Sequence, residues 1–476
     1  MIFTSYTYLL FLAVVFLAHW HLPARWRKLF LVLASYGFYM SWSWPFGFLL
    51  LGVSVFNWAY GRWVLTERRS VLRLAAGIAA NLSPLIYFKY TGFILDSAAV
   101  VGGWLGHAWH FRIGEILLPL GISFFTFQGI AYLVDVTGGE KPLESPLDFF
   151  LFKALWPQLI AGPIVRLSEM RGQIQGERTL EYGDFSQGCR RILFGFFKKV
   201  VLADALAPVV EMVFLSKAAP HVVDVTAGIL GFGMQIYFDF SAYSDIAIGS
   251  ARLFGFRLPE NFYWPYGASS PQEFWNRWHQ TLSRWIRDYL FIPLSFSYRR
   301  RPGLAPLWIL IAMAVCGLWH GAAWTFVVWG VWHGALLVLN ATRLKGFFAV
   351  SRGPSSLGER LRVVASTAVT FFLMQIGWLF FRAGSIEQAL TFLKSLLTFH
   401  GGFRPSVLRE NDVLFTVLVF GGMMAAHFVR FRCFPDVGAV FAKPWARFAK
   451  PLVYALVILS IVVFDQEAKP FVYFQF

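Results

Sequence analysis

Long apolar runs recur along this chain, and they constrain its fold more than any other feature. The first covers about residues 6–22 and the second about residues 29–44. Such runs approach or exceed the roughly 20 residues that an α-helix needs to cross a bilayer. Of the 476 residues, 57% are hydrophobic and 14% are charged, whereas a soluble domain carries about 25% charged residues. The sequence therefore predicts an all-α polytopic membrane protein with about eleven transmembrane helices.

The net charge of +16 is concentrated in short basic clusters between the apolar runs, for example at residues 25–28, 299–301 and 430–432. Basic clusters of this kind mark cytoplasmic loops. The charge therefore reflects membrane topology and does not indicate a nucleic-acid partner. Counting spans from either end of the chain predicts that both termini are extracytoplasmic.

Two stretches, residues 115–170 and 255–300, mix apolar residues with proline, glycine and charge. Irregular backbone at membrane depth is tolerated only where protein or a water-filled cavity covers it. We therefore expect re-entrant or broken helices that enclose a cavity. No Pro- or Gly-rich linker divides the chain, so we predict one membrane domain, residues 1–476, with an extracytoplasmic tail at 466–476.

Several familiar chemical signatures are missing. Cys189, Cys316 and Cys433 lie far apart, which predicts neither a disulfide framework nor a metal site. The chain also has no G-x-S-x-G elbow, no P-loop and no H-E-x-x-H motif. Candidates for chemistry must therefore come from polar residues inside apolar surroundings.

The first candidate is the run 237–245, which places Asp239 and Asp245 in an apolar stretch. A carboxylate inside a membrane is costly unless it is paired or faces a cavity. One interpretation is structural, with each carboxylate paired to an arginine and joining two helices. The other interpretation makes this run a wall of the substrate chamber.

The second candidate is the run 274–294, whose pattern predicts one amphipathic helix. Trp275 and Trp278 fall on one aromatic stripe of such a helix. Asn276 and His279 are i and i+3 neighbours, close enough on a helix to form a hydrogen bond. An alternative is a helix at the membrane interface whose arginines reach to the lipid headgroups.

The third candidate is the run 316–324, which centres on His320 in an apolar, Trp-rich setting. An ionisable residue in such a segment is a candidate functional site. Gly317 and Gly321 carry no side chain, so another molecule or another backbone can approach closely. A neutral imidazole can take the proton of a hydroxyl that attacks a thioester. The same Trp-His-Gly-Ala sequence recurs at His333, turned by about 220° if the helix is continuous.

Five of these runs resemble the membrane-bound O-acyltransferase family. They are WPQLIAGPIVR (156–166), YFDFSAYSDIAIG (237–249), LPENFYWPY (258–266), FWNRWHQTLSRWIRDYLFIPL (274–294) and GLWHGAAWTFVVWGVWHG (317–334). The resemblance extends over nearly the whole chain. It is closest to the bacterial branch that acylates polysaccharides such as alginate, peptidoglycan and cellulose, and that transfers D-alanine to teichoic acids.

The resemblance implies many helices around a central tunnel in a bacterial inner membrane, with the acyl donor on the cytoplasmic side. The signature histidine of the family matches His320, and the second histidine of the bacterial branch matches His279. His333 fits a family pattern of uncertain role. Four further side chains are expected at the substrate: Asn276, Asp239, Trp319 and Trp278.

The ending Phe-Val-Tyr-Phe-Gln-Phe (471–476) resembles the F-x-Y-x-x-F ending of this branch or of its small accessory subunits. That ending is proposed to carry the acyl group on its tyrosine, here Tyr473, before a partner takes it. The other interpretation is an aromatic anchor at the membrane interface.

The donor and partners follow from the resemblance. No permanently bound cofactor is expected; the donor is acetyl-CoA, another acyl-CoA or an acyl carrier protein, and a periplasmic SGNH-type acyltransferase receives the group. Independently of the resemblance, the basic residues Arg299 to Arg301 are candidates for binding an anionic donor, and the alternative, which the basic clusters favour, is that they only set the membrane topology.

Other functions stay open at this point. A transporter or flippase of an acylated or lipid-linked saccharide would share the broken helices and buried charges. A scaffold for polysaccharide secretion would not need a histidine between glycines inside the membrane. Lipid acylation is a further possibility within the enzyme class.

Overall fold

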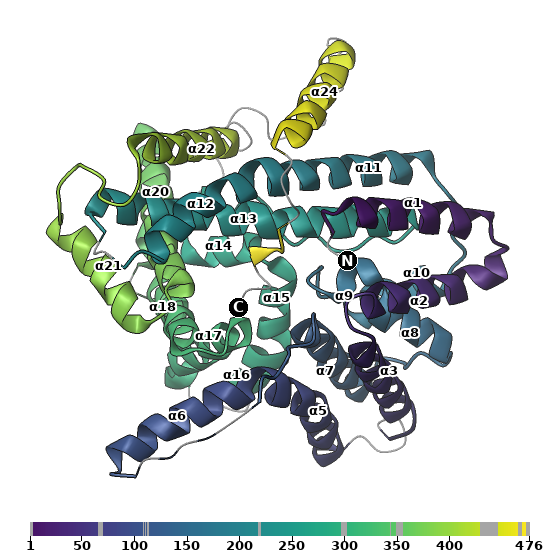
Figure 1. Cartoon of the computed structure of the whole chain (residues 1–476). Helices are drawn as coiled ribbons and strands as arrows, with labels where there is room; N and C mark the ends of the chain where they lie inside the picture. Colours follow the sequence, from purple (N-terminus) through teal and green to yellow (C-terminus); the bar gives the residue numbers. More distant parts are fainter. Residues whose placement is uncertain are drawn as a thin grey trace. The chain divides into compact units, whose positions relative to one another are not determined.

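The computed structural model of this chain describes residues 3–64, 70–107, 109, 111, 114–217, 220–296, 302–342, 344–348, 356–428, 446–464 and 469–472. All the regular elements in these ranges are helices, as the sequence predicts (Figure 1). The chain divides into two compact units, Met1–Ile192 with Tyr243–Glu260, and Leu193–Ala242 with Asn261–Phe476. The single domain over residues 1–476 stays a prediction.

The first unit holds the N-terminal helices. These are α1 (Tyr6–His21), α2 (Ala24–Met40), α3 (Trp44–Ala59), the π-helix η1 (Tyr60–Val64), α5 (Val71–Leu85), the π-helix η2 (Ile86–Tyr90), α6 (Thr91–Trp104), α7 (Ile122–Gly138), α8 (Pro146–Ala154), α9 (Trp156–Leu159), α10 (Leu167–Gln175) and most of α11 (Tyr182–Phe196). Helix α1 matches the first predicted span, whereas α2 begins and ends before the second one, which was predicted at about residues 29–44. Ser5 begins α1 by accepting a hydrogen bond from the Tyr8 amide at 3.2 Å.

The interior of the first unit contains a closed pair of amides. Asn57 on α3 and Asn81 on α5 exchange hydrogen bonds of 2.9 and 3.0 Å between their side chains. Each also donates to a backbone carbonyl of its own helix, that of Val53 or Gly77. Gly129 on α7 lies against this pair, where a Cβ atom would overlap the Asn81 oxygen.

The second unit holds the remaining helices. These are the π-helix η3 (Phe197–Ala203), α12 (Asp204–Phe214), the first part of α13 (Val222–Leu253), η4 (Pro265–Gly267), α14 (Pro271–Arg277), α15 (Gln280–Trp285), the π-helix η5 (Ile286–Phe291), α16 (Ile292–Phe296), η6 (Pro302–Leu304), α17 (Ala305–His320), α18 (Trp324–Ala341), α19 (Lys345–Phe348), α20 (Leu357–Arg382), α21 (Ile386–Thr398), α22 (Glu410–Phe428) and α24 (Ala446–Phe464).

Helices α17 and α18 form a tight hairpin (Figure 1). A Cβ atom on Gly317 would overlap the carbonyl oxygen of Phe326, and one on Gly330 would overlap the carbonyl oxygen of Met313. The missing side chains therefore let the two backbones touch, as small residues do between membrane helices. The chain leaves the helix between His320 and Trp324, so the two Trp-His-Gly-Ala repeats lie on different helices.

Three helical stretches among the described residues are long and apolar enough to cross a membrane: Val71–Trp104, Trp324–Ala341 and Leu357–Arg382. Three shorter apolar helices accompany them: Tyr6–His21, Ala305–His320 and Phe448–Phe464. The predicted count of about eleven spans is larger than the number these helices establish, and it stays a prediction.

Candidate active site

The segment around His279 is not the single helix that its pattern predicts. Helix α14 ends at Arg277 and α15 begins at Gln280. Between them Trp278 is extended, and His279 adopts the left-handed conformation with φ 41° and ψ 54°. That conformation costs a residue with a side chain about 1–3 kcal/mol. Surrounding contacts must therefore hold His279 in place, and the predicted i, i+3 relation between Asn276 and His279 is wrong because the helix breaks between them.

The loop at Asn261 supplies those contacts. The backbone oxygen of Asn261 accepts a hydrogen bond from the Gln280 amide at 2.9 Å, and the Tyr263 amide donates to the Arg277 oxygen at 2.9 Å. The Asn261 side-chain oxygen lies 3.0 Å from Nδ1 of His279. The same oxygen accepts hydrogen bonds from the hydroxyl and the amide of Thr281, at 2.9 and 3.3 Å.

These contacts assign the tautomer of His279. A backbone N–H can only donate, so the Asn261 atom that meets the Thr281 amide is its oxygen. An oxygen can only accept from the ring, so Nδ1 of His279 carries the proton. The neutral ring then has its lone pair on Nε2. Asn261 thus fixes both the orientation and the tautomer of a fully buried imidazole.

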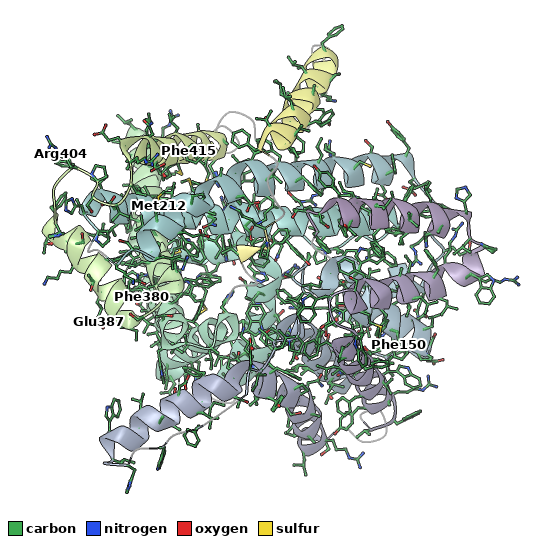
Figure 2. All side chains as sticks on the ribbon, viewed as in Figure 1. Phe150, Met212, Phe380, Glu387, Arg404 and Phe415 are labelled. Atoms are coloured by element: carbon green, nitrogen blue, oxygen red, sulfur yellow. The ribbon has the colours of Figure 1, made fainter. Side chains whose placement is uncertain are left out.

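His320 is the last residue of α17 and lies 6.4 Å from His279, measured between ring centroids. Its ring packs against Trp319 at 4.9 Å, Trp329 at 5.0 Å and Phe381 at 5.5 Å. Phe380, labelled in Figure 2, precedes Phe381 on α20. Two histidines that are 41 positions apart in the sequence therefore meet inside one aromatic enclosure.

Trp319 and Trp329 connect the histidines of this cluster. Trp319 contacts both His279 at 6.2 Å and His320 at 4.9 Å. Trp329 contacts both His320 at 5.0 Å and His333 at 4.8 Å. His333 is also buried, and its ring meets Trp275 at 5.2 Å. The structure thus gathers all three predicted histidines in the second unit.

A cavity of about 480 Å³ lies beside this cluster. Asn276 and Cys316 line it, and Cys316 lies one turn before His320 on α17. Trp275 also lines the cavity, and its ring contacts Trp329 at 5.7 Å. Most of the lining is apolar, with Arg284 and Arg287 among its polar members. Such a mixture suits a ligand with an apolar part and an anionic part.

Neither His279 nor His320 is among the residues that line this cavity, and the other predicted site residues also lie apart from its lining. Trp278 is buried among aromatic rings, including Trp378 at 4.8 Å. Asp239 forms an ion pair with Lys199 at 2.7 Å. In the first unit, Asp245 pairs with Arg191 at 2.9 Å, as the structural interpretation of that run expects.

Two groups of predicted residues, Tyr473 and the basic cluster Arg299 to Arg301, lie outside the described residues. Sequence reasoning in turn missed Asn261, Lys199 and Trp329. Asn261 occurs inside the run LPENFYWPY, and Lys199 is a cation next to a strongly apolar helix. Both features can be seen in the sequence, but neither indicates which residue the side chain contacts.

Comparisons with known proteins place this arrangement in a family. The family model described as MBOAT, membrane-bound O-acyltransferase family, matches residues 142–348. A "Probable alginate O-acetylase AlgI" of Pseudomonas aeruginosa is 38% identical over 90% of this chain and 80% of its own length. A protein of the same name from Azotobacter vinelandii is 35% identical over 93% of this chain and 88% of its own length. A "Peptidoglycan O-acetyltransferase" of Helicobacter pylori is 35% identical over 82% of this chain and 78% of its own length.

The chain belongs to the membrane-bound O-acyltransferase family. It is accordingly a multi-pass membrane protein and an enzyme that transfers acyl groups to oxygen. The resemblance seen in the sequence is confirmed.

Proposed function

We propose that this enzyme moves an acyl group, which we take to be acetyl, from a cytoplasmic thioester across a bacterial inner membrane to an extracytoplasmic polysaccharide such as alginate. The observation that carries the proposal is the buried pair of His279 and His320, whose rings lie 6.4 Å apart. The relatives named for alginate and peptidoglycan acetylation support a sugar polymer as the final acceptor.

His320 is proposed as the general base. An attacking hydroxyl oxygen forms a bond to the thioester carbonyl carbon while the ring of His320 takes the hydroxyl proton. The carbon–sulfur bond then breaks, and the leaving thiolate receives that proton. The position of His320 at the end of α17 favours this cycle, because the carbonyl end of a helix stabilises a cation.

His279 is proposed as the second proton acceptor. With its proton held on Nδ1 by Asn261, the lone pair on Nε2 can accept a hydrogen bond from the attacking hydroxyl. Because the hydroxyl has a single proton, this hydrogen bond orients it on binding, and the proton turns from His279 to His320 when the oxygen attacks. Trp319, in contact with both rings, fits a role in shaping the space for the acyl group.

The cavity of about 480 Å³ is proposed to receive the donor. Arg284 and Arg287 in its lining suit the phosphates of coenzyme A or of an acyl carrier protein. Asn276 supplies a polar side chain in the same lining. The basic cluster Arg299 to Arg301 is proposed as an outer part of the same donor site.

The route outward is proposed to use Tyr473 as a relay. A phenolic ester is activated, because a phenoxide (tyrosine pKa about 10) leaves more readily than a sugar alkoxide. An SGNH-type periplasmic partner would then take the group for the polymer. This route requires the C-terminus outside the cell, as in the predicted topology of about eleven spans around a tunnel.

The test uses His320→Ala in a bacterium that makes the polymer and lacks its own transferase. We expect ester groups on the secreted polymer, measured by NMR, to fall to background while the variant stays in the membrane at the wild-type level. Val315→Ala, on the same helix and outside the lining of the donor cavity, serves as the control. Normal ester content with His320→Ala would contradict the proposed function.

A further inference from the structure

A cluster of three charged residues, Lys199, Asp204 and Asp239, lies in the interior of the second unit. Lys199 of η3 is only 1% exposed, and its Nζ lies 2.7 Å from Asp239 and 2.9 Å from Asp204. Both carboxylates belong to neighbouring helices, α12 and α13. One lysine between two carboxylates leaves the cluster with one net negative charge.

The described C-terminal segment, residues 469–472, is bound to this cluster. The Val472 amide donates to the second Asp239 oxygen at 2.8 Å. Lys199 donates to the carbonyl oxygen of Pro470 at 3.3 Å, and its Nζ lies 4.9 Å from the Phe471 ring centroid. Phe471 and Val472 are 1% and 6% exposed.

The chemistry of these contacts suits a peptide segment. One donor and one acceptor of the cluster meet the main chain, while the Lys199 ammonium lies over an aromatic ring. Lys469 adds a positive charge and lines the same small crevice as Asp204, which complements the net charge of the cluster. The cluster therefore recognises two backbone groups, one aromatic ring and one cation.

We propose that Lys199, Asp204 and Asp239 form a binding site for the C-terminal segment of this chain, and that this site positions the segment for acyl transfer. Asp239 is followed on α13 by Phe240, whose ring contacts His279 at 4.7 Å. One residue thus binds the segment while the next contacts His279. The positioning role rests on the proposed function, because it delivers the residue after Val472 for acylation.

The test removes one backbone hydrogen bond without touching the buried charges. Asp239→Ala would leave Asp204 as the one carboxylate of this cluster beside the buried Lys199 and is expected to hinder folding. Val472→Pro removes the N–H that donates to Asp239, and its ring also restricts the backbone of residues 471 and 472. Val472→Thr has a similar shape and keeps the N–H, so the difference between the two variants measures the loss of that hydrogen bond together with the backbone restriction.

Two measurements are made on the full-length protein. Purified in detergent, Val472→Pro should lose its C-terminal residues to carboxypeptidase about tenfold faster than Val472→Thr, because a hydrogen bond to a charged group is lost. In cells, the polymer of Val472→Pro should carry fewer ester groups than that of Val472→Thr at equal protein level. Equal digestion of the two variants would overturn the binding site, and faster digestion with equal ester content would overturn its positioning role.

A third variant separates this inference from the proposed function. Tyr473→Phe leaves the sequence of residues 469–472 unchanged and removes the hydroxyl. Its digestion rate should equal that of the wild type while ester content falls to background. Normal acylation by Tyr473→Phe would remove the relay from the proposed function and the positioning role with it, whereas the digestion result tests the binding site alone.

Discussion

Two buried polar regions of this protein differ in how their hydrogen bonds are completed. In the first unit, Asn57 and Asn81 satisfy each other, and each spends its second N–H on its own helix. In the second unit, three histidines are surrounded by aromatic rings. Neither ring nitrogen of His333 has a hydrogen-bond partner among the described residues. A closed polar pair stabilises helix packing, whereas His279, held by Asn261 through Nδ1, presents its other ring nitrogen to the aromatic enclosure.

Substitutions in the two regions should therefore impair the protein in different ways, one through folding and the other through chemistry. A residue of the amide pair should matter for folding and leave the chemistry of folded molecules unchanged. A residue of the histidine pair should matter for chemistry and have a small effect on folding. Both effects are measurable on the same preparations, as ester transfer and as thermal stability in detergent.

The largest effect is expected for His279→Ala. Loss of a positioned proton acceptor lowers rates by about 100-fold or more, so transfer should nearly vanish while the melting temperature changes little. His333→Phe is the comparison, because it keeps a buried ring among Trp275 and Trp329. That variant should retain most of its transfer activity. Equal losses in the two variants would mean that the enclosure, and not the His279–His320 pair, is what the reaction requires.

The next effect concerns the closed amide pair. Asn81→Ala removes both hydrogen bonds that Asn81 exchanges with the buried Asn57 side chain. This loss should lower the free energy of unfolding by about 1–3 kcal/mol. Transfer per folded molecule should not change. Replacing both residues together, as Asn57→Leu with Asn81→Leu, should cost less than the sum of the single changes, because no polar group is left unsatisfied. Additive losses in the double variant would argue against a closed pair.

A smaller effect is expected at Asn261, which orients His279. Asn261→Ala removes the acceptor of the Nδ1 proton and should lower transfer by about tenfold, or about 1.4 kcal/mol. Asn261→Asp keeps an acceptor but adds a negative charge that stabilises the protonated ring. Its activity should therefore require a higher pH than that of the wild type. An unshifted pH profile for Asn261→Asp would show that Asn261 has a structural role only.

The sequence alone was sufficient to predict the helical class and the family, and to single out the three histidines as candidates. Hydropathy located α1 and α2, because spans are recognised by length and composition. It did not predict the break at His279, because a left-handed residue leaves no mark in an amphipathic pattern. The partner of His279 was missed for the same reason: Asn261 is 18 positions away and reaches the ring only through that break.

The glycines of the α17–α18 hairpin show a second limit. The sequence indicated that something approaches Gly317 closely, and it left open whether that is another molecule or another backbone. The structure places the Phe326 carbonyl there. Sequence patterns thus located the special positions, whereas the identity of the neighbours depended on tertiary packing.

The smallest effect concerns a buried carboxylate of the second unit. Asp224, at the start of α13, accepts hydrogen bonds from the amides of Ser406, Val407 and Leu408 at 2.8, 3.2 and 2.9 Å. It also accepts from the Ser406 hydroxyl at 2.8 Å and the His221 amide at 3.1 Å. These bonds join α13 to the loop before α22, outside the helices that are long and apolar enough to span a membrane.

This carboxylate should make stability depend on pH in the acid range. Burial raises the pKa of the Asp224 carboxyl, but its hydrogen bonds to Leu408, Ser406 and Val407 outweigh burial, so the pKa lies below its ordinary value. The unfolded chain binds the proton more readily, so the stabilisation is fully present above about pH 4 and is lost as the pH falls through the lowered pKa. Asp224→Asn removes the charge and should show a flatter decline of melting temperature between about pH 5 and pH 3. Because the effect is on stability alone, transfer at neutral pH by folded Asp224→Asn should match the wild type. Parallel declines in the two proteins would show that other carboxylates control the acid response.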